Sequence, residues 1–558
     1  MSEHSIMVRF EHGRQTRVAP GRTLRSILKQ HPRLARGLPV SLGAVVNNEL
    51  VSLQYRIETD STVRLLSYRD SYGQRIYRNT LAFLLAKTVH ERFPEIEFAV
   101  EQSLSKGLYY SFRRQGRAGI SPAQRRRLEQ GVRDLIRTDA EIERRKISFA
   151  AALEYFEKAG RKDKLNLLRF KNPSKVTVYQ CGDYFDLAQT PLADRAGALV
   201  RFKLVPHGDG FVAFGPERSD PSRFPKFDPA PYLFDVFREH TEWGRTVHVR
   251  TVGDLNERIA EKTIDGFIDL NEAYQEKRIV LLANAIAQRR ERVKWALIAG
   301  PSSSGKTTFS KRLAIQLQAN GRLARPIALD SYFVERDRTP RDEDGQPDFE
   351  HLDALDLPLI NEHLDALDRG REVELPYFNF HRGAREWRGE KMRLGPDDIV
   401  LLEGIHGLNP RLTAKIPAAH KFRIYISALT QLNLDSSNRI ATTDNRLIRR
   451  LVRDNQFRGH RALKTLEMWP RVRRGEKNWV FPYQTEADVA FNSALDYELS
   501  VLRAYAEPLL AEVKPFHPQY AEARRLQQFL ENFLIVPPDR VPPDSLLREF
   551  IGRGSFDY

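Results

Sequence analysis

Residues 300–307 carry a pattern that is typical of a phosphate-binding loop. They read GPSSSGKT, which satisfies the spacing G-x-x-x-x-G-K-[ST]. Glycines let the backbone wrap closely, so that amide N–H groups point at phosphate oxygens, and the N-terminus of a following helix adds partial positive charge. The alternative is an ordinary turn rich in Gly and Ser. The residues that we expect to hold the phosphates of a nucleotide are Gly300, Pro301, Ser302, Ser303, Ser304, Gly305, Lys306, Thr307 and Thr308.

Two acidic residues follow this loop, each at the end of an apolar run. Asp330 ends RPIALD and Glu403 ends DDIVLLE. Because ligands of α/β sheets bind at the carboxyl ends of strands, both acids should face the phosphates. We expect Lys306 and Asp330 to be catalytic, the lysine on the β- and γ-phosphates and the aspartate as the group that orients an acceptor hydroxyl and takes its proton. Thr307 and Glu403 are expected to ligate Mg²⁺, and the alternative for Asp330 is a cap on the next turn.

An arginine-rich segment, TTDNRLIRRLVRDNQFRG, lies further along the chain, with arginines that recur at helical spacing. One interpretation is a solvated basic helix. The other is a lid that closes over ATP and brings guanidinium groups to the transferring phosphate. In the second interpretation Arg449 and Arg453 bind the nucleotide, Arg450 and Arg458 bind the substrate, and Arg446 lies on the same repeat.

Strands and helices must position these residues. Residues 293–535 alternate apolar runs with amphipathic stretches, which predicts a parallel α/β sheet. In it WALIA is a buried strand directly before the loop, and TTFSKRLAIQLQANG is a helix directly after it, with Gly321 as its C-cap. Residues 231–292 show helical spacing and predict a helical connector. The tail, 536–558, is Pro-rich and then apolar, and is expected to dock on its own chain or on a partner.

The first 230 residues show a different pattern from the α/β alternation of residues 293–535. Residues 1–67 predict a β-grasp fold: IMVRF and QTRVAP are strands around a turn, Thr23 caps a helix, and SLGAVVNNELVSL holds two strands joined by an Asn-Asn turn. Residues 68–230 open with an amphipathic helix, NTLAFLLAKTVHERFP, and continue with strand patterns. Between Arg113 and Arg145 the segment is strongly basic.

The length and composition of the chain limit the number of domains and the classes of partner that we expect. The 558 residues suggest three or four domains, and the formal net charge of +16 favours polyanionic partners such as nucleotides, nucleic acid or an anionic membrane. The single cysteine, Cys181, excludes an internal disulfide and a cysteine zinc cluster. The start lacks the apolar core of a signal peptide, and no run of about 18 apolar residues occurs, so we expect a cytoplasmic protein without a membrane span.

Six motifs resemble, in their order, the uridine kinase and phosphoribulokinase family: the loop, LDSYF, DFEHLDALD, PYFNFHRGAREW, LLEGIHGL and TDNRLIRRLVRDNQFRG. The whole chain is similar to bacterial nucleoside kinases in which such a domain is fused behind a TGS domain and the second domain of threonyl-tRNA synthetases. The resemblance implies an α/β fold, with a P-loop NTPase parallel sheet preceded by a β-grasp TGS domain and an α+β editing-like domain. It also implies ATP and Mg²⁺ as cofactors.

Residues 68–230 depart from the synthetase pattern at the positions that would do chemistry. The synthetases have a His-x-x-x-His helix, followed much later by a Cys and a His. The matching positions here hold Asn79, Phe83, Ala188 and Leu192. We therefore expect the shape of the editing domain without its metal or its hydrolysis of aminoacyl esters.

The substrate-reading residues depart as well. The family's ribose-binding Asp corresponds to Glu350, and its base-reading Tyr and His correspond to Phe378 and Gly383, with His381 close enough to replace the imidazole. The lysine and arginine expected on the adenine side are absent from PYQTEADVAFNSA. The resemblance implies that Phe349, Phe378 and Phe380 wall the base and that Glu350 holds the ribose. The full set of expected substrate contacts is Tyr332, Phe349, Glu350, Phe378, His381, Arg450 and Arg458.

Hypotheses from different classes remain. The first is a kinase for the 5′-hydroxyl of a small-molecule nucleoside. The second is an RNA- or ribosome-associated ATPase that its synthetase-like front half regulates, which the TGS-like start and the basic stretch favour. A kinase of another hydroxylated metabolite, such as a sugar phosphate or pantothenate, is a weaker third. We prefer the nucleoside kinase because Asp330, Glu403 and the arginine helix all address an acceptor. We further expect a homo-oligomer, with RNA contact through the front half left open.

Overall fold

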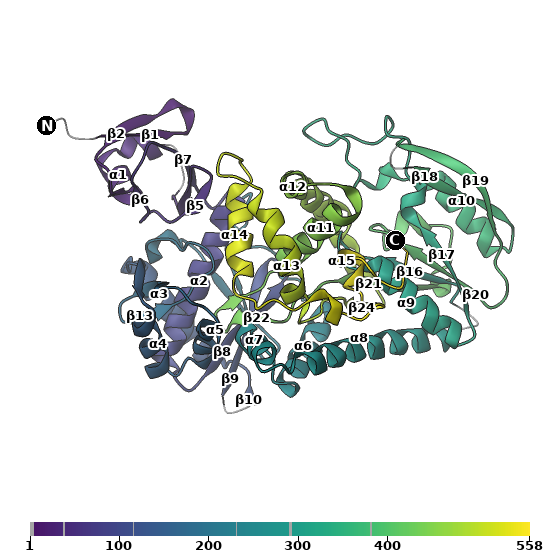
Figure 1. The fold of residues 1–558 in the computed structure, drawn as a ribbon, viewed down its shortest axis with the longest axis horizontal. Helices are drawn as coiled ribbons and strands as arrows, with labels where there is room; N and C mark the ends of the chain where they lie inside the picture. The colour runs from purple at the N-terminus through teal and green to yellow at the C-terminus, as the bar shows by residue number, and fades with distance from the viewer. Residues whose placement is uncertain are drawn as a thin grey trace.

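The computed structural model describes residues 5–36, 40–114, 117–229, 231–289, 293–379 and 382–557. Figure 1 shows the N-terminal strands at one end of an elongated molecule and the large parallel sheet at the other, with helices packed between them. Among the residues that the structure describes, none of the helices combines the length and the apolar character that a membrane crossing requires.

The first residues form a five-stranded mixed sheet in the order β2-β1-β7-β4-β5, as a β-grasp fold requires. Thr23 accepts a hydrogen bond from the Ser26 amide, which confirms the predicted N-cap. The predicted Asn-Asn turn is also confirmed, since Asn47 and Asn48 both have left-handed backbone angles that suit a tight hairpin. The elements are β1 (Ile6–Phe10), β2 (Gln15–Val18), β3 (Arg22–Thr23), α1 (Leu24–Gln30), β4 (Gly43–Val46), β5 (Glu49–Val51), β6 (Arg56–Ile57) and β7 (Ser61–Leu66).

The next part packs one long helix against two antiparallel sheets. Its central helix is buried on every side from Thr80 to Val89. The sheets have the orders β10-β9-β15-β14, with β8 on β9, and β11-β12-β13. The elements are α2 (Ser71–Arg92), β8 (Glu97–Leu104), β9 (Gly107–Arg114), β10 (Arg117–Ala118), α3 (Pro122–Arg137), β11 (Glu143–Ser148), α4 (Phe149–Lys158), α5 (Lys162–Arg169), β12 (Lys175–Cys181), β13 (Tyr184–Asp186), β14 (Lys203–His207) and β15 (Gly210–Phe214). This mixture agrees with the α+β fold that the sequence predicts.

Three helices then cross to the second half: α6 (Pro231–Thr246), α7 (Val252–Ala260) and α8 (Ile264–Ala287). The predicted helical character of the connector is confirmed. One apolar core runs from Phe156 and Leu167 through Ile279 to Ile298 and Phe550, so the two halves share buried side chains. The domain boundaries themselves stay predictions.

The second half is built on a parallel sheet in the order β17-β20-β16-β21-β24, which confirms the predicted α/β architecture. Its strands are β16 (Trp295–Ala299), β17 (Leu323–Ala328), β20 (Asp398–Glu403), β21 (Lys421–Ser427) and β24 (Val489–Asn492). The helices are α9 (Lys306–Ala319), α10 (Leu357–Asp368), α11 (Thr442–Arg458), α12 (Ala462–Trp479), α13 (Glu498–Ala511), α14 (Tyr520–Leu530) and α15 (Arg548–Ile551). Two hairpins project from it, β18 (Val373–Asn379) with β19 (Ala384–Met392), and β22 (Asn433–Asp435) with β23 (Asn438–Arg439).

The C-terminal tail docks on its own chain, which decides between the two predicted alternatives. Leu546, Leu547 and Phe550 have no exposed surface. Figure 1 shows the C-terminus and α15 beside α9 and the parallel sheet, far from the N-terminus.

Candidate active site

The phosphate loop joins β16 to α9, as the sequence predicts. The five residues of β16 are buried, so the loop leaves the sheet from a fixed point. Gly300 is required there, because a Cβ atom would lie 2.1 Å from the carbonyl oxygen of Ile426. Gly305 has a φ of 81°, a left-handed angle that glycine adopts without strain, and it starts the helix.

Lys306, Thr307 and Glu403 meet at the carboxyl ends of the central strands. The Lys306 ammonium donates across the loop to the carbonyl of Pro301 at 3.3 Å. The Thr307 hydroxyl donates to Oε2 of Glu403 at 3.4 Å. Glu403 ends β20, which lies between β16 and β17. A hydroxyl beside a carboxylate is a donor set that Mg²⁺ uses next to nucleotide phosphates, so these residues fit the predicted metal.

The Glu403 carboxyl takes up a proton more readily than an ordinary glutamate does. Burial raises the pKa of Glu403 to about 7; repulsion from Asp330 and Glu549 adds to it, and Lys306 and Thr307 oppose it. A magnesium ion would reverse this preference, because it binds the carboxylate form.

Asp330 lies in the 3₁₀ turn Leu329–Tyr332 that directly follows β17. Its side chain reaches solvent but is walled by protein, and this burial raises the pKa of its carboxyl, against the opposing charges of Lys306, Arg458 and Arg453. The structure thus brings Asp330 within the electrostatic influence of the loop lysine. A raised pKa suits a carboxylate that must accept a proton.

Helix α11 lies directly on the phosphate loop. Arg446 donates to the Ser302 carbonyl at 2.9 Å and is ion-paired with Glu476, and Arg450 donates to the Ser302 hydroxyl at 2.8 Å. Because Arg446 and Arg450 are buried, a solvated helix does not describe this part of the segment. Arg446 and Glu476 also tie α11 to α12, so the loop is covered by two helices.

The other predicted arginines divide into two groups. Arg453 and Arg458 pair with Asp454 at 2.9 and 3.6 Å. The positive charges of both arginines also act on Asp330, where they lower the pKa of its carboxyl. Arg449, in contrast, is fully buried and donates to Glu498 at 2.7 Å and to the Ser493 carbonyl at 2.8 Å. A contact from Arg449 to the nucleotide is therefore not supported, because its guanidinium already has buried partners.

The predicted acceptor wall is assembled in part. The ring of Phe333 lies 6.4 Å from that of Phe349 and 5.6 Å from that of Phe378. Tyr332 is buried, with its hydroxyl 3.1 Å from Nδ1 of His363, so a contact from Tyr332 to the substrate is not supported. Residues 380 and 381, and with them the predicted imidazole of His381, lie outside the described residues.

Glu350 stands out among the predicted substrate contacts. Its Oε2 is buried and has no hydrogen-bond partner within the described part of the chain. Burial and the charge of Glu476 raise its pKa to about 7, against Arg450 and Lys306. A buried oxygen without a partner calls for an explanation, and a bound ligand or an ordered water that supplies the missing bond would give one.

Sequence reasoning missed two glutamates that contact the loop. Oε1 of Glu476 accepts from the Ser302 amide at 3.1 Å, and Oε2 of Glu549 accepts from Thr308. Glu476 was detectable in principle as a single acid in the basic stretch RVRRGEKNW. Glu549 lies 241 positions after Thr308, and no local pattern connects the two.

The four editing positions of the front half are occupied by packed side chains. The Asn79 amide donates to the Thr190 hydroxyl at 2.5 Å, and the Phe83 ring lies 5.4 Å from that of Tyr184. Leu192 is buried beside them and Ala188 packs against the same core.

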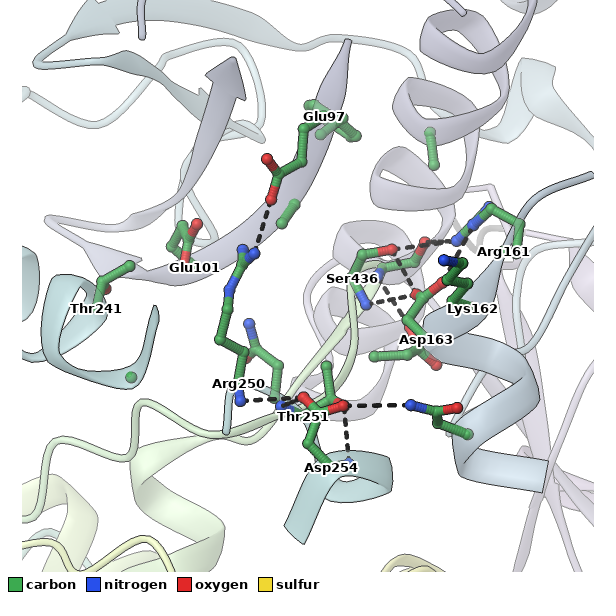
Figure 2. A pocket seen from close by; sticks show the side chains of 18 of the residues that line it. Glu97, Glu101, Arg161, Lys162, Asp163, Thr241, Arg250, Thr251, Asp254 and Ser436 are labelled. Carbon is green, nitrogen blue, oxygen red and sulfur yellow. Dashed lines mark hydrogen bonds and ion pairs between the residues drawn. The ribbon is translucent and has the colours of Figure 1, made fainter. Parts of the chain in front are cut away.

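A cavity of about 710 Å³ lies elsewhere, at the junction of the two halves, between β8, α5, α7 and β22. Figure 2 shows Arg250 extended toward Glu97 and Asp163 beside Ser436. Asp254 caps α7 through the Thr251 amide. Each of these carboxylates thus has a partner inside the protein.

Comparison with known proteins also separates the N-terminal part of the chain from the C-terminal part. Residues 297–500 match the family described as Phosphoribulokinase / Uridine kinase family. The N-terminal part is similar to threonine–tRNA ligases. That of Desulforamulus reducens is 29% identical over 202 residues, 36% of this chain and 31% of the ligase. That of Coxiella burnetii is 32% identical over 166 residues, 30% of this chain and 25% of the ligase. The chain thus spans a third or less of the length of these curated relatives.

Solved structures with similar segments include one described as a possible uridine kinase from Bacillus stearothermophilus, 17% identical, which covers 39% of this chain and 98% of its own with a TM-score of 0.28. Another is the D-glycerate 3-kinase from Cryptococcus neoformans, 14% identical, which covers 48% of this chain and 89% of its own with a TM-score of 0.22. The family match, together with the strand–loop–helix unit at residues 295–319, places the C-terminal part of the chain in the phosphoribulokinase and uridine kinase family, joined to an N-terminal part related to threonine–tRNA ligases.

Proposed function

We propose that the protein is a kinase that transfers a phosphoryl group from ATP to the 5′-hydroxyl of a nucleoside, uridine or a close analogue. The observation that carries the proposal is the meeting of Lys306, Thr307, Glu403 and Asp330 at the carboxyl ends of three adjacent strands. The matched family supports a small-molecule kinase, and the nucleoside is our own, finer assignment.

The phosphate side of the reaction belongs to the loop and to α11. ATP supplies the phosphoryl group when bound, and Mg²⁺ neutralises charge on its oxygens. Lys306 and the amides at the start of α9 offer positive charge and N–H donors to the phosphates. Thr307 and Glu403 would hold the metal ion, and Arg450, already on Ser302, helps to close the loop against water.

The acceptor side belongs to Asp330. The oxygen of the acceptor hydroxyl forms the new bond to phosphorus, the bond to the leaving oxygen of ADP breaks, and the hydroxyl proton passes to the Asp330 carboxylate. Phosphoryl transfer has a loose transition state, so the orientation of the hydroxyl contributes more than strong basicity. The raised pKa of Asp330 still favours taking up the proton.

The nucleoside assignment rests on the wall beside Asp330. Phe349 is exposed and Phe333 half-buried, so both offer ring surface to a base, and the buried Phe378 packs behind Phe333. The unpartnered Oε2 of Glu350 offers an acceptor to a ribose hydroxyl. A simple ATPase has no use for such a wall.

The test is a reaction of the full-length protein with ATP, Mg²⁺ and a panel of nucleosides, with sugars and pantothenate as competing acceptors, read by mass spectrometry. We expect a nucleoside monophosphate as the main product. A phosphorylated sugar or pantothenate instead would keep the kinase and refute the nucleoside.

A second function is favoured by one observation: Arg126 on α3 and Arg144 and Arg145 on β11 are exposed on the front half. They support an RNA-associated ATPase. The test is the release of phosphate from ATP with and without RNA. Release that RNA stimulates and that needs no acceptor would support this function over the kinase.

A further inference from the structure

The C-terminal segment packs directly on the phosphate loop. A Cβ atom added to Gly305 would lie 2.2 Å from a methyl carbon of Leu546, so the segment also explains why this loop position is glycine. The guanidinium of Arg449 lies 4.9 Å from the centre of the Phe550 ring, and the Ser545 hydroxyl donates to Glu272 on α8 at 2.6 Å. The segment is thus anchored on α8, α9 and α11 at once.

From this anchored segment, Glu549 reaches the start of α9. Its Oε2 accepts from the Thr308 amide at 3.1 Å and from the Thr308 hydroxyl at 3.0 Å. Thr308 is fully buried and Glu549 is 8% exposed. Thr308 is the third residue of α9, so its amide is one of the N–H groups that no carbonyl of the helix can satisfy. A carboxylate there is stabilised by these donors and by the helix dipole.

The same donors are those that a phosphate-binding loop offers to a nucleotide. One carboxylate oxygen already accepts from both the amide and the hydroxyl of Thr308, so a phosphate oxygen can take these bonds only when Glu549 withdraws. The two groups are also both anionic and would repel each other. The charge of Glu549 already acts on Glu403, where it helps to raise the pKa of that carboxyl.

We propose that Glu549 is an internal competitor of the nucleotide: its carboxylate occupies a phosphate position of the loop in the free protein and must turn away when ATP binds. This inference rests on the proposed kinase function. Because Leu546, Leu547 and Phe550 are buried independently of Glu549, the segment stays docked while the side chain moves. The C-terminal segment thereby sets the nucleotide affinity of the site.

The experiment compares ATP binding in the presence of Mg²⁺, by calorimetry, in the full-length protein, in Glu549→Gln and in the control Asp544→Asn. Asp544 is an exposed acid five positions earlier in the same tail. We expect Glu549→Gln to lower the Kd for ATP roughly tenfold or more, since a charge-assisted bond no longer competes. We expect Asp544→Asn to leave it unchanged.

A second measurement needs no variant. Amide hydrogen exchange of wild-type residues 306–310 and 545–552 is followed with and without ADP and Mg²⁺. We expect slower exchange in the first segment, because phosphate oxygens bind its amides, and unchanged exchange in the second, because the tail stays docked while only the Glu549 side chain moves.

The outcomes separate the two proposals. Equal ATP affinity in wild type and Glu549→Gln, weaker binding by Glu549→Gln, or added protection of residues 545–552 would each overturn the inference and leave the kinase intact. If neither protein binds any nucleotide while both unfold cooperatively at similar temperatures, the proposed function fails and takes the inference with it.

Discussion

The pKa values of Glu403 and Glu350 near the phosphate loop are shifted in the opposite direction to those of Glu97 and Asp163 at the junction cavity. Near the loop, burial raises the pKa values of Glu403 and Glu350 to about 7. At the cavity, burial acts in the same direction on Glu97 and Asp163, but Arg250 in the first case and Lys164 and Arg161 in the second outweigh it and lower their pKa values. The positive charges outweigh burial at Glu97 and Asp163, whereas those of Lys306 and Arg450 do not outweigh it at Glu403 and Glu350. The buried Asp435 of the cavity is an exception, because burial raises its pKa although Lys164 opposes the shift.

The two regions also differ in how their buried polar groups are satisfied, and this difference separates a candidate ligand site from a structural contact. Buried hydroxyls of Ser303 and Ser304 and Oε2 of Glu350 have no hydrogen-bond partner in the described ranges. Groups that a protein leaves unsatisfied and strongly perturbed are characteristic of ligand sites, whereas satisfied ion pairs are characteristic of structure. We therefore propose that the chemistry takes place at the loop, and that the ion pairs of the junction stabilise the fold.

Removing the loop lysine should break the binding side of the comparison. Lys306→Ala deletes the ammonium that lies across the loop, so we expect ATP turnover to fall by at least about a hundredfold. The measurement is ADP formation, with circular dichroism as the check on folding. The matched control is Lys415→Ala, which replaces an exposed lysine and should leave turnover near normal. Near-normal turnover by Lys306→Ala would refute the phosphate-loop assignment.

The structural side is tested at Lys164. Its ammonium lies 2.6 Å from both Asp186 and Asp435, and all three are buried, so it joins the front half to β22. Lys164→Ala removes the nearest counter-charge of two buried carboxylates, of which Asp186 keeps only the more distant Arg161 at 3.8 Å, and should destabilise the protein by about 3–5 kcal/mol. Urea unfolding measures this.

The control for Lys164 is the exposed pair of Lys158 and Glu154 on α4. Lys158→Ala should change the free energy of unfolding by less than about 1 kcal/mol. Equal effects of the two substitutions would contradict a structural role for the junction.

Proton uptake by Glu403 should appear in the pH dependence of binding. Its pKa of about 7 in the free protein lies above the usual range, so the carboxyl gains a proton as the pH falls through 7, and a protonated carboxyl does not ligate Mg²⁺. The Mg²⁺-dependent affinity for ATP should therefore fall by up to about tenfold per pH unit below 7. In Glu403→Gln the affinity should be low and flat over the same range, and a flat wild-type profile would refute the metal assignment.

The smallest expected effect concerns RNA and the front half. Arg126 and Arg127 are exposed on α3, whereas Arg125 is paired with Glu129. If the exposed pair contacts RNA, replacing both by Gln should flatten the plot of log K against log salt by about 0.7 per lost phosphate contact. Nucleoside phosphorylation should not change. Absence of RNA binding by the wild type even at low salt would leave the front half as a scaffold.

The local sequence pattern predicts those parts of the site whose residues are close together in the sequence. The loop, its strand and helix, and the positions of Asp330 and Glu403 follow from apolar runs that end in polar residues. Arg449 and Tyr332 were expected to face ligands, but Glu498 and His363 engage them in the core. Such partners lie 49 and 31 positions away, and a helical repeat of arginines does not tell which of its members turns inward. Glu549 is the extreme case, because its contact is set by the docking of the whole tail.

In the proposed reaction, Asp330 directs the phosphoryl group to an acceptor hydroxyl. The most direct measurement is the ratio of phosphorylated nucleoside to ADP in wild type and Asp330→Asn, together with the Kd for ATP. We predict one phosphorylated nucleoside per ADP in the wild type. In the variant we predict an unchanged Kd and a rate of transfer that is lower by about a hundredfold or more. Unchanged transfer in Asp330→Asn, or ADP formed by the wild type without a phosphorylated acceptor, would contradict this role of Asp330.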